Sequence, residues 1–217
     1  MVQLTRSLIQ YISDVSLREP DVLKRLREVT ERHPHGSWAT GPEQTQLLAL
    51  IAHMIGARCI LEVGTFTGYT SLALALTLPK DGRLITLDLE ESYPAVGRPF
   101  WKEAGVEERI EVRIGEALAS MEALLDTPGP GAFDMVYIDC NKKDYDAYYE
   151  HALSLVRAGG VICFDNVLWG GSVADPKDHE KSTMALRSLN QKLHIDTRVM
   201  ISLLPIGDGL TIAWKRP

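Results

Sequence analysis

The stretch that decides the fold runs from Leu61 to Ser71 and reads LEVGTFTGYTS. The short apolar run Cys59–Val63, which overlaps its start, has the length and composition of a buried strand, and the Ala- and Leu-rich segment after it has those of a helix. Between the two, Gly64 and Gly68 let the backbone turn sharply and approach a ligand closely. This order of strand, glycine turn and helix is typical of an α/β domain that binds a ligand at the turn.

Outward from this turn, the chain alternates short apolar runs with segments of helical length. Continuous apolar strands between helices indicate a parallel sheet covered on both faces. The sequence therefore predicts an α/β fold with a Rossmann-like doubly wound sheet of about seven strands and helices on both faces. The expected strands are 59–63, 84–89, 110–114, 133–138, 161–164, 198–204 and 211–214. A turn-rich stretch, 205–209, joins the last two as a hairpin, so we expect the last strand to run antiparallel.

Two helices are predicted before the first strand. Apolar residues at helical spacing follow Pro20 and continue to about His33, and a second stripe runs from Pro42 to Gly56. The sequence contains no Ser/Gly-rich linker, low-complexity tract or internal repeat. We therefore expect a single domain over residues 1–217, with a helical N-terminal extension over about 1–40.

The composition argues against several classes of protein. Of the 217 residues, 45% are hydrophobic and 24% are charged, as in a globular protein with a large core. The net charge of −6 argues against general nucleic-acid binding, which needs clustered Lys and Arg. Three widely spaced cysteines suggest a reducing compartment. The first residues lack a signal-peptide pattern, and no apolar run approaches the roughly 20 residues of a membrane span. We expect a cytoplasmic protein with neither a membrane nor a nucleic-acid partner.

The first two strand ends predict a nucleoside site. A dinucleotide-binding turn reads GxGxxG, whereas Phe66 here occupies the place of the second glycine and would keep a pyrophosphate away. Asp88, at the end of the second strand, can accept hydrogen bonds from ribose hydroxyls. After the third strand, Gly115, Glu116 and Ala117 form a small-residue turn against which an adenine ring can lie. The pattern favours a ribose-containing ligand, although a tight turn with a solvated Asp would look the same.

Two further strand ends carry oxygen ligands. Asp139 follows 133–138, and Asp165 and Asn166 follow 161–164. If these strands are neighbours, their carboxyl ends bring the side chains together. Two carboxylates and an amide carbonyl suit a hard divalent cation, Mg²⁺ first and Mn²⁺ or Ca²⁺ as alternatives. The competing interpretation, in which these residues only cap helices or shape a turn, stays open.

Four segments carry a family resemblance. They are LEVGTFTGYTSLALAL at 61–76, TGPEQTQ at 40–46, the stretch 139–145 and FDNVLWGGSV at 164–173. They resemble the cation-dependent O-methyltransferases of the caffeoyl-coenzyme A and catechol types, and the similarity extends to 18–34 and 204–209. The resemblance implies a class I methyltransferase domain, S-adenosylmethionine (SAM) as methyl donor, a divalent cation, a small phenolic acceptor and a homodimer.

The resemblance also implies roles for individual residues. Together with Phe66 and Glu116 from the two turns, the predicted donor contacts are Thr40, Glu62, Gly64, Thr65, Thr70, Asp88, Ala117 and Asp139. Asp139, Asp165 and Asn166 would hold the cation, and Lys142 would be the general base beside Asp139. A phenol with a pKa near 10 is a poor nucleophile at neutral pH, so a cation on both oxygens of a vicinal diol would stabilise the phenolate.

Departures from the family pattern leave the acceptor open. Trp38 stands where methionine is usual, and with Trp169 it is predicted to wall a flat aromatic ring, although buried core positions would suit both. Cys140 and Asn141 replace the usual Ala-Asp, and 174–183 is shorter than in the plant coenzyme A enzymes.

We expect a catechol or related vicinal-diol phenol as acceptor, with a caffeoyl-coenzyme A-type thioester as the alternative. An NAD-dependent oxidoreductase and a catalytically silent binding protein on the same fold are further alternatives. The histidines show no ligand spacing, and none is predicted in the site.

Overall fold

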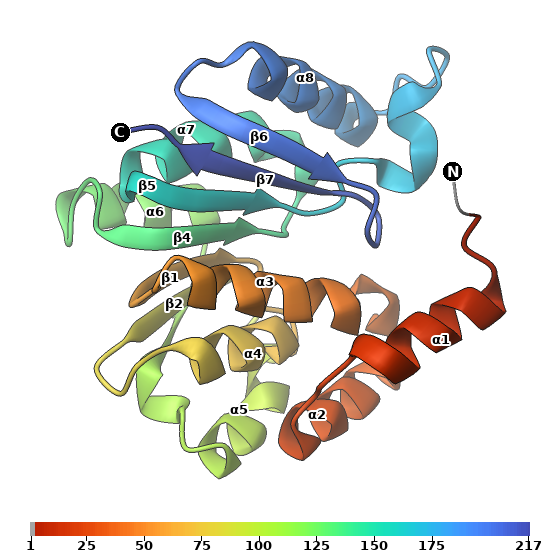
Figure 1. The fold of residues 1–217 in the computed structure, drawn as a ribbon. Helices are drawn as coiled ribbons and strands as arrows, with labels where there is room; N and C mark the ends of the chain where they lie inside the picture. Colours follow the sequence, from red (N-terminus) through yellow and green to blue (C-terminus); the bar gives the residue numbers. More distant parts are fainter. Residues whose placement is uncertain (1–2) are drawn as a thin grey trace.

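Seven strands form one sheet in the order β3-β2-β1-β4-β5-β7-β6 in the computed structural model, which describes residues 3–217 (Figure 1). The strands are β1 (Cys59–Val63), β2 (Arg83–Asp88), β3 (Ile110–Ile114), β4 (Phe133–Ile138), β5 (Val156–Phe164), β6 (Val199–Leu204) and β7 (Leu210–Lys215). Strands β1 to β5 pair in parallel, and β7 is antiparallel to both β5 and β6. The predicted doubly wound sheet with an antiparallel last strand is confirmed.

Helices cover both faces of this sheet (Figure 1). They are α1 (Arg6–Ser16), α2 (Asp21–Glu31), α3 (Pro42–Met54), α4 (Tyr69–Thr77), α5 (Pro94–Glu103), α6 (Ala117–Asp126), α7 (Tyr145–Leu155) and α8 (Lys181–Ile195). Short 3₁₀ turns are η1 (Gly36–Trp38), η2 (Glu107–Arg109), η3 (Lys142–Asp144) and η4 (Trp169–Ala174). Within residues 3–217, no helix is both long enough and apolar enough to cross a bilayer.

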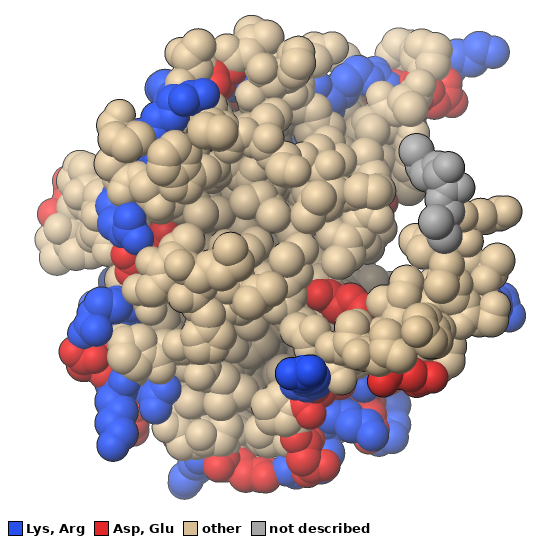
Figure 2. Space-filling view, viewed as in Figure 1, with Lys and Arg blue, Asp and Glu red and all other residues tan. Residues whose placement is uncertain are grey.

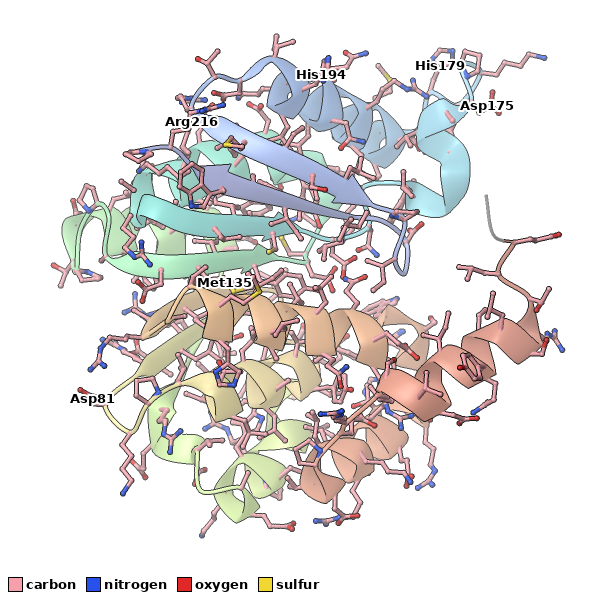
Figure 3. The ribbon with its side chains drawn as sticks, in the orientation of Figure 1. Asp81, Met135, Asp175, His179, His194 and Arg216 are labelled. Carbon is pink, nitrogen blue, oxygen red and sulfur yellow. The ribbon has the colours of Figure 1, made fainter. Side chains whose placement is uncertain are left out.

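Side chains along each strand alternate between two cores, as the two-residue period of a strand requires. Leu61 and Val63 pack in the core beneath α6, α7 and α8, whereas Ile60 packs in the core beneath α2 to α5. Met135 of β4 belongs to the second core and points toward α3 in Figure 3. Because the central strands β1 and β4 are buried on both faces, they are almost continuously apolar, and this composition made them predictable, whereas β6 at the edge of the sheet is largely exposed.

The largest difference from the predicted strands is the start of β5. The strand begins at Val156, five residues before the predicted start at Val161. The first residues include Arg157, Gly159 and Gly160, and the register against β4 shifts between Phe133 and Met135. Polar and glycine residues in an irregular ladder carry no apolar signal, so the sequence pattern missed them.

Charged side chains are distributed unevenly over the surface. In the view of Figure 2, Lys, Arg, Asp and Glu gather along the margins, and the middle of the face, over α3, β7 and β6, is largely free of them. Exposed apolar residues on these elements include Leu50 and Met54 of α3 and Ile201 of β6. This face lies beside the edge of the sheet that carries the carboxyl ends of the parallel strands, rather than on that edge.

The order of the strands reverses between β1 and β4. In open α/β sheets a crevice forms at this reversal, outside the carboxyl ends of the strands. The backbones leaving β1 and β4 approach each other closely, because the Asp139 amide donates to the Val63 carbonyl over 2.8 Å. Gly64 has a φ of +102°, and a Cβ atom there would lie 1.9 Å from the Asp139 carbonyl oxygen. Glycine is therefore required where the crevice begins.

Candidate active site

A cavity of about 880 Å³ opens at the carboxyl ends of the central strands. All of the predicted site residues except Glu62 line it, although they come from distant parts of the chain. They are Trp38, Thr40, Gly64, Thr65, Phe66, Thr70, Asp88, Glu116, Ala117, Asp139, Lys142, Asp165, Asn166 and Trp169. The predicted strand ends thus converge on one space.

The glycine turn after β1 is held by the carboxylate of Asp88. Its Oδ2 atom accepts backbone N–H groups from Thr65 and Phe66 over 3.1 and 2.8 Å, and its Oδ1 atom accepts that of Glu90 over 3.1 Å. Phe66 has a φ of +48°, an unusual value for a residue with a side chain. Asp88 therefore stabilises a strained turn as well as facing the cavity.

Glu62 lies behind this turn, away from the cavity. Its side chain is 1% exposed, and its Oε2 atom accepts hydrogen bonds from Ser71 of α4 and, over 2.7 Å, from Thr86 of β2. Its Oε1 atom has no hydrogen-bond partner. Burial, reinforced by the charges of Asp139 and Asp88, raises the pKa of Glu62 to about 8. This placement does not support the predicted direct donor contact, because the carboxyl group joins β1, β2 and α4 instead.

The two carboxylates predicted to hold a cation meet as expected. Asp139 and Asp165 follow β4 and β5, which are neighbours with Ile138 opposite Phe164. The Asp165 Oδ1 atom accepts the Asn166 backbone N–H over 2.6 Å. Burial, with the nearby charge of Asp139, raises the pKa of Asp165 to about 6. A pair of like charges in a buried site favours the binding of a cation.

Lys142 is held directly beside this pair. Its side chain is 8% exposed, and its Nζ atom donates to Asp139 Oδ1 over 3.0 Å and to the Tyr145 hydroxyl over 2.9 Å. The ring of Trp169 is centred 5.9 Å from the same nitrogen. Lys142 is thus a buried, paired group that faces the cavity, unlike a solvated surface lysine.

The rim of the cavity carries an aromatic cluster that the sequence did not predict. It consists of His33, His35, Trp38, Phe66 and Tyr93. Trp38 and His35 stack with ring centroids 4.2 Å apart and planes inclined by 9°. Trp38 is 56% exposed, so it is a rim residue and does not belong to the core.

Other residues in the lining were also missed. Tyr137, Gln44 and Asp208 line the cavity without having been predicted. A signal existed for Tyr137, because it stands two residues before Asp139 and side chains along a strand face the same way every second residue. His194 lies on α8 and His179 lies just before this helix, both at the top of Figure 3. Neither histidine lines the cavity.

The electrostatics of the cavity favour positively charged ligands. Its lining includes six acidic side chains and one basic side chain, Lys142. The acidic ones are Asp88, Glu90, Glu116, Asp139, Asp165 and Asp208. Within residues 3–217, no group of three or more His, Cys, Asp or Glu side chains is arranged to hold a metal. The predicted cation site has two carboxylates, and the prediction takes the amide of Asn166 as its third protein ligand. Two carboxylates and one amide fit a hard cation that keeps further positions for water or substrate.

Comparisons with known proteins agree with this geometry. The sequence model of a family described as O-methyltransferase matches residues 13–216. The chain is 44% identical over 208 residues to catechol O-methyltransferase domain-containing protein 1 of Mus musculus, covering 96% of this chain and 79% of that protein. It is 41% identical over 219 residues to a probable caffeoyl-CoA O-methyltransferase of Arabidopsis thaliana, covering 96% of this chain and 93% of that protein.

Solved structures show the same similarity. The O-methyltransferase TomG from Streptomyces achromogenes, in complex with SAM, has a TM-score of 0.88 and 35% identity, covering 97% of this chain and 96% of that chain. An O-methyltransferase from Bacillus cereus, in complex with SAH (S-adenosylhomocysteine), has a TM-score of 0.87 and 31% identity, covering 97% of both chains.

Proposed function

The chain belongs to the O-methyltransferase family and is a SAM-dependent enzyme; we propose that it methylates one hydroxyl of a catechol or related vicinal-diol phenol with the help of a divalent cation. The observation that carries this proposal is the pair of carboxylates, Asp139 and Asp165, at neighbouring strand ends beside Lys142. One part of the site would then bind the methyl donor and the other would prepare the acceptor.

The donor would bind along the turns after β1, β2 and β3. Asp88 would accept hydrogen bonds from the ribose hydroxyls while it keeps its bonds to the backbone of Thr65 and Phe66. The small residues Gly115 and Ala117 leave room for the adenine ring. SAM carries a sulfonium charge and no phosphate, which suits an acidic lining better than a phosphate-binding nest would.

The cation would be held by Asp139, Asp165 and Asn166. When bound, it supplies positive charge that stabilises the phenolate form of the acceptor and holds both oxygens of a vicinal diol. Mg²⁺ fits this donor set best, because it prefers oxygen ligands and keeps several positions for water and substrate.

Lys142 would act as the general base. Its Nζ atom faces the cavity beside the carboxylates; in its neutral amine form, which the positive charge of a bound cation would favour, it would take the proton of the acceptor hydroxyl. Trp38 and Trp169 would confine the flat ring of the acceptor between them. With the acceptor oxygen and the donor methyl group held in line, transfer depends mainly on proximity and alignment.

The charge of the cavity supports a catechol over a coenzyme A thioester. Coenzyme A carries several phosphate charges, and the lining offers six carboxylates against one lysine that is already paired with Asp139. A small phenol without phosphate avoids this repulsion. The thioester alternative would need basic side chains at the rim of the cavity.

We also propose that the protein is a cytoplasmic homodimer. Three free cysteines, Cys59, Cys140 and Cys163, favour a reducing compartment. Helix α1 buries none of its residues in the single chain, and its Ile9, Tyr11 and Val15 side chains are exposed. An apolar surface of this kind supports association with a second copy. Light scattering on the purified protein measures the oligomeric state directly.

The proposed function is tested by methyl transfer from labelled SAM to a panel of catechols, simple phenols and coenzyme A esters. We expect catechols to be methylated, the activity to disappear in excess EDTA, and Mg²⁺ to restore it. Equal activity in EDTA would contradict the cation mechanism, and faster methylation of the thioester would select the alternative acceptor.

SAH should raise the melting temperature of the protein, whereas stabilisation by NAD would favour an oxidoreductase. Stabilisation by SAH without transfer to any acceptor would favour a silent binding protein.

A further inference from the structure

Tyr137 occupies a central and unassigned place in the cation site. It is the second-last residue of β4, its side chain is 1% exposed, and it lines the cavity. Its hydroxyl lies 2.6 Å from Asp165 Oδ2 and 2.9 Å from Thr40 Oγ1. A buried hydroxyl with a partner on each side is fixed in direction.

The chemistry of these groups sets the direction of the hydrogen bonds. An ionised carboxylate can only accept, so the Tyr137 hydroxyl donates to Asp165 and its own oxygen accepts from Thr40. Thr40 Oγ1 also lies 3.4 Å from Asp139 Oδ2, but its single proton can go to only one acceptor, and the contact to Tyr137 is the shorter of the two.

This arrangement determines how Asp165 presents its oxygens. The Oδ1 atom is held by the backbone N–H of Asn166 and the Oδ2 atom by Tyr137, which fixes the plane of the carboxylate. Each oxygen has two lone pairs and therefore keeps capacity for a cation. Without the tyrosine hydroxyl, Asp165 would be free to turn away from Asp139, because the two like charges repel each other.

We propose that Tyr137 is a positioning residue that orients Asp165 for the cation, and that Thr40 in turn fixes the tyrosine hydroxyl. This inference rests on the proposed function, because it assumes that Asp165 binds the cation. Hydrogen-bonded partners of metal ligands of this kind typically change metal affinity by about 10- to 100-fold when they are removed.

The test measures the binding of Mn²⁺ to the Tyr137→Phe variant with neither donor nor acceptor present. Binding is detected as a loss of the electron paramagnetic resonance signal of free Mn²⁺. We expect the dissociation constant for Mn²⁺ to rise about tenfold relative to wild type. In methyl transfer, the cation concentration for half-maximal rate should rise by the same factor, and kcat at saturating Mg²⁺ should recover. Thr40→Val, which removes the hydrogen bond to Tyr137 and the longer contact to Asp139 Oδ2, should raise the dissociation constant by about threefold, and it carries the test if Tyr137→Phe does not fold.

The matched control is Tyr149→Phe. Tyr149 is fully buried and donates to Asp196 Oδ2 over 2.7 Å, but it does not line the cavity. It should lose thermal stability as Tyr137→Phe does, with no change in Mn²⁺ affinity. Equal Mn²⁺ affinity of Tyr137→Phe and wild type, or an equal loss of affinity in Tyr149→Phe, would overturn this inference alone. A wild-type protein that takes up no Mn²⁺ would overturn the proposed cation dependence and this inference with it.

Discussion

The two ends of the cavity are held together by different kinds of contact. At the end proposed to bind the donor, Asp88 accepts backbone N–H groups from the turn after β1, so main-chain hydrogen bonds hold the turn. At the end proposed to bind the cation, the side chains of Asp139, Lys142 and Asp165 face the cavity; Lys142 bonds to Asp139, and Lys142 and Asp165 bond to neighbouring tyrosine hydroxyls. One end is shaped by backbone geometry, the other by a charged side-chain network.

This difference predicts where the protein tolerates change. A backbone surface persists when one side chain is shortened, so substitutions at the donor end should weaken ligand binding moderately. In a buried network of charges, the removal of one partner leaves the others unbalanced. Substitutions at the cation end should therefore reduce catalysis strongly and leave donor binding intact.

The largest effect is expected for Asp165→Ala. Loss of one of two carboxylate ligands should lower kcat/KM for a catechol by about 100- to 1000-fold, because Lewis-acid stabilisation contributes several kcal/mol. The stabilisation of the protein by SAH, measured as the shift in melting temperature, should not change. The control is Asp175→Ala, an exposed residue on the loop after η4 that points to solvent in Figure 3. Retention of activity in Asp165→Ala would remove the distinction between the two ends.

The next effect concerns the proton acceptor. Lys142→Met should lower kcat by about 100-fold, the usual contribution of a positioned general base, with little change in the KM for SAM. Lys143→Met is the matched control, because Lys143 is adjacent in sequence but exposed. Steady-state kinetics at saturating Mg²⁺ separate the two quantities. If the Lys142→Met variant lost affinity for SAM and kept its kcat, Lys142 would contribute to donor binding and would not be the general base.

A smaller effect is expected at the donor end. Asp88→Ala removes a predicted ribose contact and the acceptor for two backbone amides, so the dissociation constant for SAH should rise about tenfold, as expected for a lost charged hydrogen bond. Isothermal titration of SAH measures this, and Mn²⁺ affinity should stay at the wild-type value. Asp88→Asn keeps one acceptor oxygen and should show an intermediate loss. Weakened Mn²⁺ binding in Asp88→Ala would show that the ends are not independent.

Substitution of Glu62 is expected to have the smallest effect on the reaction. Its effect should instead be visible in the stability of the protein. The pKa of Glu62 is 4.5 in the unfolded chain and about 8 in the folded protein, so between these values the folded protein holds one more proton. The free energy of unfolding therefore falls as pH rises, by up to about 1.4 kcal/mol per pH unit from this group. Glu62→Gln removes this slope, and urea unfolding at pH 5.5 to 8.5 should show the variant gaining on wild type as pH rises. Parallel curves for the two proteins would contradict the burial of a protonated Glu62.

Much of the fold could be predicted because the central strands of the sheet are buried on both faces. The strands β1, β3 and β4 begin and end where the apolar runs do, whereas β5 extends back over Arg157 and two glycines that carry no apolar signal. Asp88, Asp139 and Asp165 were identifiable because each is the last residue of a strand or follows one directly, and parallel strands bring their carboxyl ends to one edge. Glu62, predicted as a donor contact, does not line the cavity, since position along a strand indicates the face but not whether a turn covers the side chain.

By itself, the sequence determined the alternation of strands and helices, the glycine turn after the first strand, and the acidic residues at the strand ends. Only the tertiary structure decided that Thr40 and Tyr137, 97 positions apart, share a hydrogen bond, and that two histidines and a tyrosine join Trp38 at the rim. The physical reason is that strand periodicity and turn chemistry are local properties of the chain. Hydrogen bonds and ring contacts between distant segments depend on how the helices pack on the finished sheet.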